Sequence, residues 1–352
     1  MTLEQLGWNP FFWDASGNFF NQNLIPARVT EAYYNRYKTI SVHGETLVAL
    51  TGKLRAECES AGNYPVTGDW LMIEGAAAHV LLPRRTVLAR KSVGKQTAGQ
   101  TICANMDRVL VVGALDGEWN PRRIERFLTA GWNSGATPAV VLNKRDACGD
   151  WEAALAETEA SAPGVEVLAV SARDGGGMDE LARLIPPCAT AVMIGSSGVG
   201  KSSLLNTLAG TVLRDTGDVH AATSQGRHTT SSRGLFFLPN GGMMIDTPGL
   251  RELGLWAEED ALSGVFSDII EIAAGCRYRD CMHENEPDCA VREALANGSI
   301  TRGHYENYLK QRREIAYVER MADPRLEREN REKWKKINKF QKEIEKHGKR
   351  KI

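Results

Sequence analysis

The sequence predicts a multidomain α/β protein with a small N-terminal β-barrel, a central domain built on a parallel sheet, and a helical C-terminal module. From Arg28 to about Cys103, short segments that alternate apolar and polar residues are separated by Gly, Asn and Pro, as in small barrels. From Met106, apolar runs typical of strands buried on both faces alternate with helical stretches, which favours a parallel sheet. After about Trp256 these runs end, and helical patterning with a Cys/His cluster follows.

These boundaries divide the 352 residues into four parts, and two or three domains are expected at this length. Residues 1–27 form an N-terminal extension to which the pattern assigns no structure. Residues 28–103 form the barrel, 104–255 the α/β domain, and 256–352 the helical module with a basic C-terminal arm. No apolar run approaches the ~18 residues of a membrane-spanning helix, and the start lacks a secretory signal. We therefore expect a cytoplasmic protein without membrane contact.

The formal net charge of −1 conceals a strong asymmetry. From Arg302 to Ile352 there are 17 Lys and Arg against 9 Asp and Glu, whereas the preceding 301 residues hold 26 against 35. A solvated, charge-rich helix is the usual explanation of such an arm, and a polyanionic partner is the alternative. Small barrels commonly bind RNA through basic grooves, and this one contains Lys53, Arg55, Arg84, Arg85, Arg90, Lys91 and Lys95. The two basic regions together favour RNA as a partner.

A glycine-rich stretch, GSSGVGKS, follows the apolar run TAVMI and precedes the helical stretch SSLLNTLAG. This is the context of a phosphate-binding loop, whose backbone amides surround phosphate oxygens at a helix N-terminus. In this arrangement Lys201 reaches the β- and γ-phosphates and contributes to catalysis, and Ser202 ligates Mg²⁺. The residues predicted to bind the phosphates are Gly195, Ser196, Ser197, Gly198, Val199, Gly200, Lys201 and Ser202.

Two further motifs predict that the base is guanine. Asn143, Lys144 and Asp146 belong to an N-K-x-D motif directly after the apolar run PAVVL. The Asp146 carboxylate can accept hydrogen bonds from the ring N–H and the exocyclic amine of guanine, a donor pair that adenine lacks. Ser171 and Ala172 follow the run VEVLAV and resemble the S-A-x loop that contacts guanine through a main-chain amide.

A D-x-x-G motif, Asp246-Thr-Pro-Gly249, follows the apolar run GGMMI. We expect Asp246 to hold Mg²⁺ through water and the amide of Gly249 to sense the γ-phosphate. Between the phosphate loop and this motif lies GRHTT, where a switch loop belongs. Thr230 of that stretch is the predicted second protein ligand of Mg²⁺, with Thr229 as the alternative.

The group that orients the attacking water is less obvious. Many GTPases carry Gln directly after D-x-x-G, but this chain has Leu250, which has no hydrogen-bonding group. His228 is the nearest replacement by sequence, because an imidazole beside Thr230 could position or polarise water. An exposed loop histidine explains the same residue equally well. Either explanation fits a slow intrinsic rate that a partner accelerates.

The motifs occur in circularly permuted order. In most GTPases the phosphate loop comes first, whereas here N-K-x-D and S-A-x precede it. A parallel sheet tolerates this change, because the residues still meet at the C-terminal edge of the strands wherever the chain enters. After Gly249 the chain runs directly into the C-terminal module.

A cluster of metal-binding residue types follows the α/β domain. Cys276-x4-Cys281-x-His283-x5-Cys289 supplies three thiolates and one imidazole, the ligand set of a closed tetrahedral zinc site. Three buried cysteines and a surface histidine would not explain this crowding among polar residues. We predict one structural Zn²⁺ without a catalytic role, because the set leaves no open coordination position.

The order NKRD, SAR, GSSGVGKS, GRHTT, DTPG and Cys/His cluster resembles one family, the circularly permuted ribosome small-subunit-dependent GTPase A (RsgA) of bacteria. The resemblance covers about residues 28–320 and extends to the segments NYPVTGDW and PRRIERFL. It implies an OB-type barrel, a permuted GTPase domain and a zinc-containing helical domain. It also implies GTP hydrolysis to GDP and phosphate, stimulated by the ribosome, on the small ribosomal subunit late in its assembly, with rRNA contact. The residues that carry over by this similarity are Asn143, Lys144, Asp146, Gly195 through Ser203, Thr230, Asp246, Gly249, Cys276, Cys281, His283 and Cys289, with Arg173 in place of the usual lysine of the S-A-x loop.

Two other hypotheses remain open from the sequence. An RNA-binding zinc protein could use GTP as a structural ligand or timer without appreciable turnover, and Leu250 keeps this alternative open. A GTPase similar to translation factors, acting on tRNA or mature ribosomes, would share the chemistry and differ in its partner. For the favoured function we expect a monomer that contacts the small ribosomal subunit and its rRNA.

Overall fold

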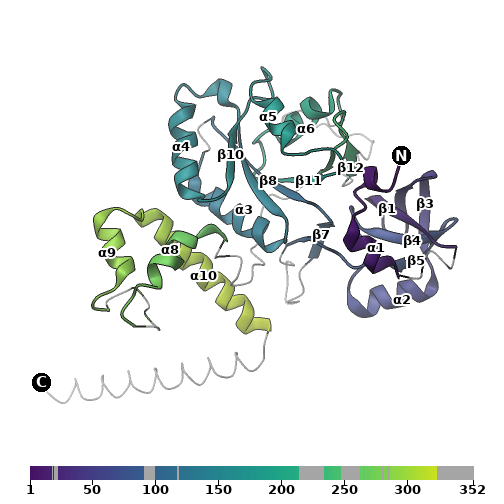
Figure 1. Cartoon of the computed structure of the whole chain (residues 1–352), viewed down its shortest axis with the longest axis horizontal. Helices are drawn as coiled ribbons and strands as arrows, with labels where there is room; N and C mark the ends of the chain where they lie inside the picture. Colours follow the sequence, from purple (N-terminus) through teal and green to yellow (C-terminus); the bar gives the residue numbers. More distant parts are fainter. Residues whose placement is uncertain are drawn as a thin grey trace, which may run out of the picture.

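The computed structural model describes residues 1–17, 19, 23–90, 100–116, 119–213, 234–246, 262, 264–278, 281, 283 and 286–322, without the side chains of 316–322. Figure 1 shows the barrel on one side of a central sheet and the C-terminal helices on the other. This arrangement confirms the predicted multidomain α/β fold.

Five strands form the closed barrel in the order β1-β2-β3-β5-β4. Their bounds are β1 (Ile25–Ala32), β2 (Tyr37–Ser41), β3 (Gly44–Leu50), β4 (Trp70–Glu74) and β5 (Ala77–Leu81). The helix α2 (Gly52–Ala61) connects β3 to β4, and the Thr51 side chain caps it by accepting a hydrogen bond from the Leu54 amide. A five-stranded barrel of this kind matches the expected OB type. The strands β6 (Val87–Arg90) and β7 (Gln100–Ala104) pair with each other outside the closed barrel.

The N-terminal extension packs on the outer face of the barrel, because its core cluster includes Trp70 and Met72, whereas the alternate residues Leu71 and Ile73 belong to the barrel interior. It contains η1 (Glu4–Leu6) and α1 (Pro10–Ser16), which begins after Asn9 because that side chain accepts a hydrogen bond from the Phe11 amide. Its side chains join barrel residues in a separate core cluster, and the ring centroid of Trp8 lies 4.8 Å from that of Trp70 in an edge-on contact. The sequence pattern did not predict this role, because segments of three and seven residues are too short to show a hydrophobic period.

A buried arginine attaches the barrel to the central domain. Arg28 of β1 is 1% exposed, and its guanidinium donates to the carbonyl oxygens of Leu6 at 2.6 Å, Asn105 at 2.8 Å and Gly68 at 3.4 Å. It also lies 5.7 Å from the ring centroid of Trp70. Burial lowers the pKa of Arg28 to about 10, partly offset by Asp107, so the side chain stays charged at neutral pH. The carbonyl groups that Arg28 contacts lie in the N-terminal extension (Leu6), in the barrel (Gly68) and in the segment before the central sheet (Asn105).

The central sheet has six strands in the order β10-β9-β8-β11-β13-β12. All neighbours are parallel except β12, which is antiparallel to β13. The strands are β8 (Arg108–Ala114), β9 (Thr137–Asn143), β10 (Glu166–Ala169), β11 (Thr190–Ile194), β12 (Gly234–Phe237) and β13 (Met243–Asp246). The helices between them are α3 (Pro121–Asn133), η3 (Arg145–Ala147), α4 (Trp151–Ser161), α5 (Met178–Arg183) and α6 (Lys201–Ala209).

Alternate residues of the central strands face opposite helical layers. Val109 and Val111 of β8 belong to the core that includes α3, whereas Leu110 and Val112 belong to the core that includes α5 and α6. This alternation explains the continuous apolar runs, because a strand covered on both faces has no polar side.

The C-terminal module packs on the α3 side of the sheet. Its helices are α8 (Ser267–Ala273), α9 (Ala290–Asn297) and α10 (Arg302–Ala322). Phe266, Ile269 and Tyr305 share one core cluster with α3 residues. Within the described chain, no helix combines the length and apolarity needed to cross a membrane.

Candidate functional site

The carboxyl ends of the parallel strands bring the predicted nucleotide residues to one edge of the sheet. β9 ends at Asn143, β13 ends at Asp246, the segment after β10 holds Ser171, and β11 leads directly into Gly195. Ligands of open α/β sheets bind at this edge, so the permuted order still assembles one site.

The phosphate loop depends on its glycines. Gly195, Gly198 and Gly200 have φ values of +148°, +84° and +92°, a region that residues with a side chain rarely adopt. A Cβ at Gly195 would collide with the carbonyl oxygen of Val112, and one at Gly200 would collide with the Asn143 amide. The loop is therefore built against the N-K-x-D segment, and only glycine fits at these two positions.

Lys201 is held inside the loop. Its ammonium donates to the carbonyl oxygens of Gly195 at 2.8 Å and Ser196 at 2.6 Å. Burial lowers the pKa of Lys201 to about 8, and the Asp246 carboxylate partly offsets this effect. Phosphate oxygens beside the ammonium would favour its charged form in the same way, so the site suits an anionic ligand.

Asn143 joins three loops and is 2% exposed. Its Nδ2 donates to the carbonyl oxygen of Val199 at 2.9 Å, and its Oδ1 accepts from the Ala172 amide at 3.2 Å. Asn143 therefore sets the spacing between the phosphate loop and the S-A-x loop. Lys144 has a left-handed backbone with φ +63° and forms an ion pair with Asp116.

Asp146 is held by the loop that the sequence placed beside it. The Ser171 hydroxyl donates to Asp146 Oδ1 at 2.8 Å and accepts from the amides of Arg173 at 3.3 Å and Asp174 at 3.2 Å. Asp146 Oδ2 lies 3.8 Å from the guanidinium of Arg173, whose side chain is 88% exposed. The Ser171 hydroxyl thus fixes the orientation of the Asp146 carboxylate through one of its two oxygens.

These residues line a cavity of about 530 Å³, within the range of roughly 300–1,000 Å³ that is usual for small-molecule sites. The lining residues are Asp116, Asn143, Lys144, Asp146, Ala147, Ala172, Arg173, Gly200, Ser203, Asn206 and Thr207. The sequence pattern did not indicate Asp116, Asn206 or Thr207. Asp116 follows β8 at the same sheet edge, and Asn206 and Thr207 lie one helical turn after Ser203. Their places after a strand and on the phosphate-loop helix could have predicted that they line the site.

The residues predicted to form the switch loop and to sense the γ-phosphate are a separate case. His228, Thr229, Thr230, Gly249 and Leu250 lie outside the described residues. Asp246 lies at the end of β13 and is 9% exposed, beside Lys201. Its carboxylate and the Ser202 hydroxyl are the oxygen donors that Mg²⁺ prefers.

The predicted metal ligands lie together in the C-terminal module. The ligand atoms of Cys276, Cys281, His283 and Cys289 are all within 4.8 Å of one another. Cys276 Sγ lies 3.9 Å from Cys289 Sγ, and His283 Nδ1 lies 3.5 Å from each of these sulfurs. A tetrahedral zinc site with Zn–S of about 2.3 Å and Zn–N of about 2.0–2.1 Å has S···S edges of about 3.8 Å and S···N edges of about 3.5 Å. Burial lowers the pKa of His283, and Arg312 adds to this, which favours the neutral imidazole that binds zinc. The Cys3His set therefore fits Zn²⁺.

Comparison with known proteins agrees with this geometry. Residues 81–256 match the family model described as RsgA GTPase. The chain is 44% identical over 329 residues to the small ribosomal subunit biogenesis GTPase RsgA of Syntrophotalea carbinolica, with 90% of each chain covered. It is 42% identical over 352 residues to the protein of that name from Opitutus terrae, with 96% of each covered.

This chain belongs to the RsgA GTPase family. It is a GTP hydrolase. The fold resembles the crystal structure of YjeQ from Thermotoga maritima, with a TM-score of 0.62 at 26% identity, covering 83% of this chain and 98% of that one. It also resembles YloQ, described as a circularly permuted GTPase, with a TM-score of 0.58 at 22% identity, covering 83% and 95%. The permuted fold predicted from the order of the motifs is thereby confirmed.

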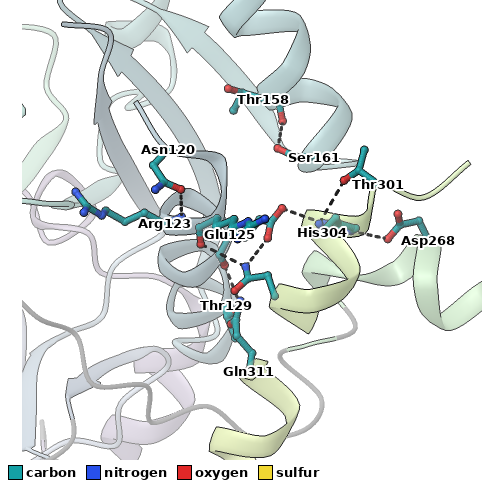
Figure 2. A network of polar contacts seen from close by, with 12 residues as sticks. Asn120, Arg123, Glu125, Thr129, Thr158, Ser161, Asp268, Thr301, His304 and Gln311 are labelled. Carbon is teal, nitrogen blue, oxygen red and sulfur yellow. Dashed lines mark hydrogen bonds and ion pairs between the residues drawn. The ribbon is translucent and has the colours of Figure 1, made fainter. Parts of the chain in front are cut away.

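In this RsgA GTPase a buried polar network joins the GTPase domain to the zinc module (Figure 2). Glu125 of α3 is 1% exposed, and its Oε1 lies 2.8 Å from His304 Nδ1 of α10. His304 Nε2 lies 3.2 Å from Asp268 Oδ1 of α8, and the Asn307 amide bonds the second Glu125 oxygen. Burial alone would lower the pKa of His304, but its hydrogen bonds to Asp268 and Glu125 raise it to about 9. The histidine is therefore charged at neutral pH and balances two carboxylates.

Some basic residues assigned to the barrel surface have structural partners instead. The Arg84 side chain is 9% exposed, and its NH2 lies 2.7 Å from the buried Asp69 carboxylate. Arg85 forms an ion pair with Asp107, and Arg90 donates to Gln100 at 2.8 Å. Lys53 and Arg55 are exposed on α2, whereas Lys91 and Lys95 lie outside the described residues. The sequence could not separate these cases, because the acidic partners are distant along the chain.

Proposed function

We propose that this GTPase binds the small ribosomal subunit and hydrolyses GTP to GDP and phosphate during late assembly of that subunit. The observation that carries the chemistry is the cavity that Asn143, Asp146 and Ala172 line beside the phosphate loop. The partner is inferred from relatives at 42–44% identity that are named small ribosomal subunit biogenesis GTPase RsgA.

In the proposed reaction the chain acts by positioning and by electrostatics. Asp146 and the Ala172 amide orient guanine, and Lys201 neutralises charge on the β- and γ-phosphates. Ser202 and Thr230 ligate Mg²⁺, which would neutralise developing charge when bound, and Asp246 supports it through water. Gly249 senses the γ-phosphate, and His228 is the candidate for orienting the attacking water. The zinc ligands hold a structural ion in the C-terminal module.

The barrel supplies a second surface that suits RNA. The β1–β2 hairpin and β3 line a hollow of about 810 Å³ that includes Tyr33, Tyr34, Arg36 and Lys38. Tyr34 is 96% exposed and Tyr33 44%, and exposed aromatic rings next to cations are what unpaired bases stack on. We infer that this hollow contacts rRNA, and that the protein acts as a cytoplasmic monomer.

The decisive experiment measures GTP turnover alone and with purified small subunits, purified large subunits or free tRNA. We expect a low intrinsic rate that only small subunits stimulate. Stimulation by large subunits or tRNA instead would favour a GTPase similar to translation factors. Equal turnover in all four conditions would contradict the proposed partner.

A further inference from the structure

A polar groove of about 420 Å³ lies between α3 of the GTPase domain and α10 of the C-terminal module. Four cationic side chains line it, and only two carboxylates do. The cations are Arg122, Arg123, Arg126 and Lys310, and the carboxylates are Glu306 and Glu314. The groove therefore carries a positive charge that the two helices do not balance between them.

Two of the four cations are already paired with carboxylates across the groove. Arg126 NH2 lies 3.1 Å from Glu314 Oε2. Arg122 NH2 lies 3.9 Å from Glu306 Oε2, and Arg302 also approaches that carboxylate at 3.1 Å.

The other two cations have no ion pair with a carboxylate among the described residues. Arg123 NH1 donates to the hydroxyl of Ser196 in the phosphate loop at 3.3 Å. Lys310 is exposed, and its ammonium has no hydrogen bond or ion pair within the described residues.

Two donors without acceptors among the described residues lie buried beneath the groove. Gln311 is 1% exposed, and its Oε1 lies 2.7 Å from the Thr129 hydroxyl, as Figure 2 shows. Its Nε2 has no hydrogen-bond partner among the residues that the structure describes, and neither has the buried Nε of Arg126. Both atoms are screened from solvent, so a ligand in the groove meets the exposed cations instead.

We propose that this groove binds a phosphate group of the RNA backbone. Phosphate oxygens match the excess of cations in the groove, because guanidinium and ammonium groups donate charge-assisted hydrogen bonds to them. A polymer is favoured over a free ion because Lys310 and Arg122, with a side chain that is 61% exposed, stand at an open rim. Within α10, Arg302–Ala322, the sequence holds 5 basic against 3 acidic residues, an excess that attracts a polyanion. The inference rests on the proposed ribosomal function and names one contact surface within it.

The test measures affinity for purified small subunits at several salt concentrations. The variants are Lys310→Gln and Arg122→Gln, and the charge-matched control is Arg183→Gln, which removes one charge from α5 beside Glu180. Each groove variant should bind roughly fivefold more weakly at physiological salt and reduce the slope of log affinity against log salt by about one. The control should bind as the parent does. Thermal midpoints equal to the parent's would show that each variant is folded.

Two results would overturn the proposal. One is that both groove variants keep the affinity and salt slope of the parent. The second result would come from titrating each variant with inorganic phosphate at constant ionic strength. If the variants lose phosphate binding while their affinity for small subunits is unchanged, the groove binds a free ion. If the parent itself does not bind small subunits, the proposed function fails, and this outcome is distinct from failure of the groove.

Discussion

At the scale of single residues, the guanine side of the site depends on side chains that hold one another. Asn143 links the phosphate loop to the S-A-x loop, and Ser171 holds one oxygen of Asp146 at 2.8 Å. Because Asp146 is already oriented, its carboxylate can receive two parallel donors without further ordering of the side chain. Base selectivity should therefore change with the chemistry of this single group.

Asp146→Asn should weaken GTP binding and improve binding of xanthosine triphosphate, whose additional oxygen pairs with an amide. We expect a loss of at least tenfold for GTP, since a buried hydrogen-bonding pair is mismatched. Competition binding with both nucleotides measures the change, and Asp174→Asn, at an exposed carboxylate of the neighbouring S-A-x loop, is the control. Parent-like binding of both nucleotides would remove Asp146 from the base.

His304 predicts a pH dependence of stability. Its pKa is raised from an ordinary value of 6.5 to about 9 in the folded protein, so its stabilising contribution is complete below pH 6.5 and lost as pH rises through about 9. A difference of this size corresponds to about 3 kcal/mol. Urea unfolding followed at pH values from 6 to 9.5 should show this decline, and His304→Gln should reduce it. His79→Gln, at a half-buried histidine of the barrel, should keep the parent profile. A parental profile in His304→Gln would contradict the assignment.

At the scale of secondary-structure elements, the helices α8, α9 and α10 are short or highly charged, and each depends on contacts outside itself. The Tyr305 hydroxyl of α10 donates to the His283 carbonyl at 3.2 Å, which connects the zinc cluster to the helix that carries His304. Metal binding at this cluster is therefore expected to order the surface that packs against α3.

Zinc removal should loosen residues 270–295 without preventing nucleotide binding. Cys281→Ala, or strong chelation, removes one ligand or the ion, and the site lies in a different module from the guanine cavity. Hydrogen exchange should rise in this region and in α10, while GTP affinity stays at the parent value. Cys188→Ala, outside the cluster, is the control. Elemental analysis that finds no stoichiometric zinc in carefully prepared protein would contradict the prediction.

The strand β1 is anchored by one residue, Arg28. Arg28→Met keeps an apolar stem of similar length but leaves the carbonyls of Leu6, Gly68 and Asn105 without this donor. We expect a loss of about 3 kcal/mol in the free energy of unfolding, because buried polar groups lose their partners. Urea denaturation measures it, with Arg36→Met at the exposed hairpin as the control. A midpoint within experimental error of the parent would show that the anchor is dispensable.

At the scale of the whole molecule, the GTPase domain contacts both other modules. The barrel approaches β12 and β13 near Arg28, and the C-terminal module packs on α3 through Glu125 and His304. The permutation also places the D-x-x-G motif between the sheet and the C-terminal module in sequence. A rearrangement driven by the γ-phosphate would therefore change the spacing between the two RNA-facing surfaces.

Small-subunit affinity should consequently differ between the GDP form and a form with a non-hydrolysable GTP analogue. Only a ligand with different affinities for two states can shift them, and by linkage the subunit must change nucleotide affinity by the same factor. Both affinities should fall steeply with salt. Equal subunit affinities in the two nucleotide forms would leave the permutation without a coupling role.

The sequence alone determined the parts of this protein whose chemistry is local. Each motif needs a few residue types at fixed offsets beside a strand or turn, as in the phosphate loop, N-K-x-D, S-A-x and the Cys3His spacing. Their chemistry can therefore be predicted from the sequence alone. The parallel sheet was predictable for a related reason, because strands buried on both faces leave continuous apolar runs.

Only the tertiary structure decided which distant residues meet. The sequence shows that Arg28 and Arg84 are charged but not what they bind. Folding places Arg28 against three buried carbonyl groups and Arg84 against the Asp69 carboxylate. Glu125 and His304 are 179 positions apart, and nothing in the segment PRRIERFL, which contains Glu125, indicates that partner. A buried charge is tolerated only where packing supplies a partner, and that partner depends on how elements dock, which no local spacing encodes.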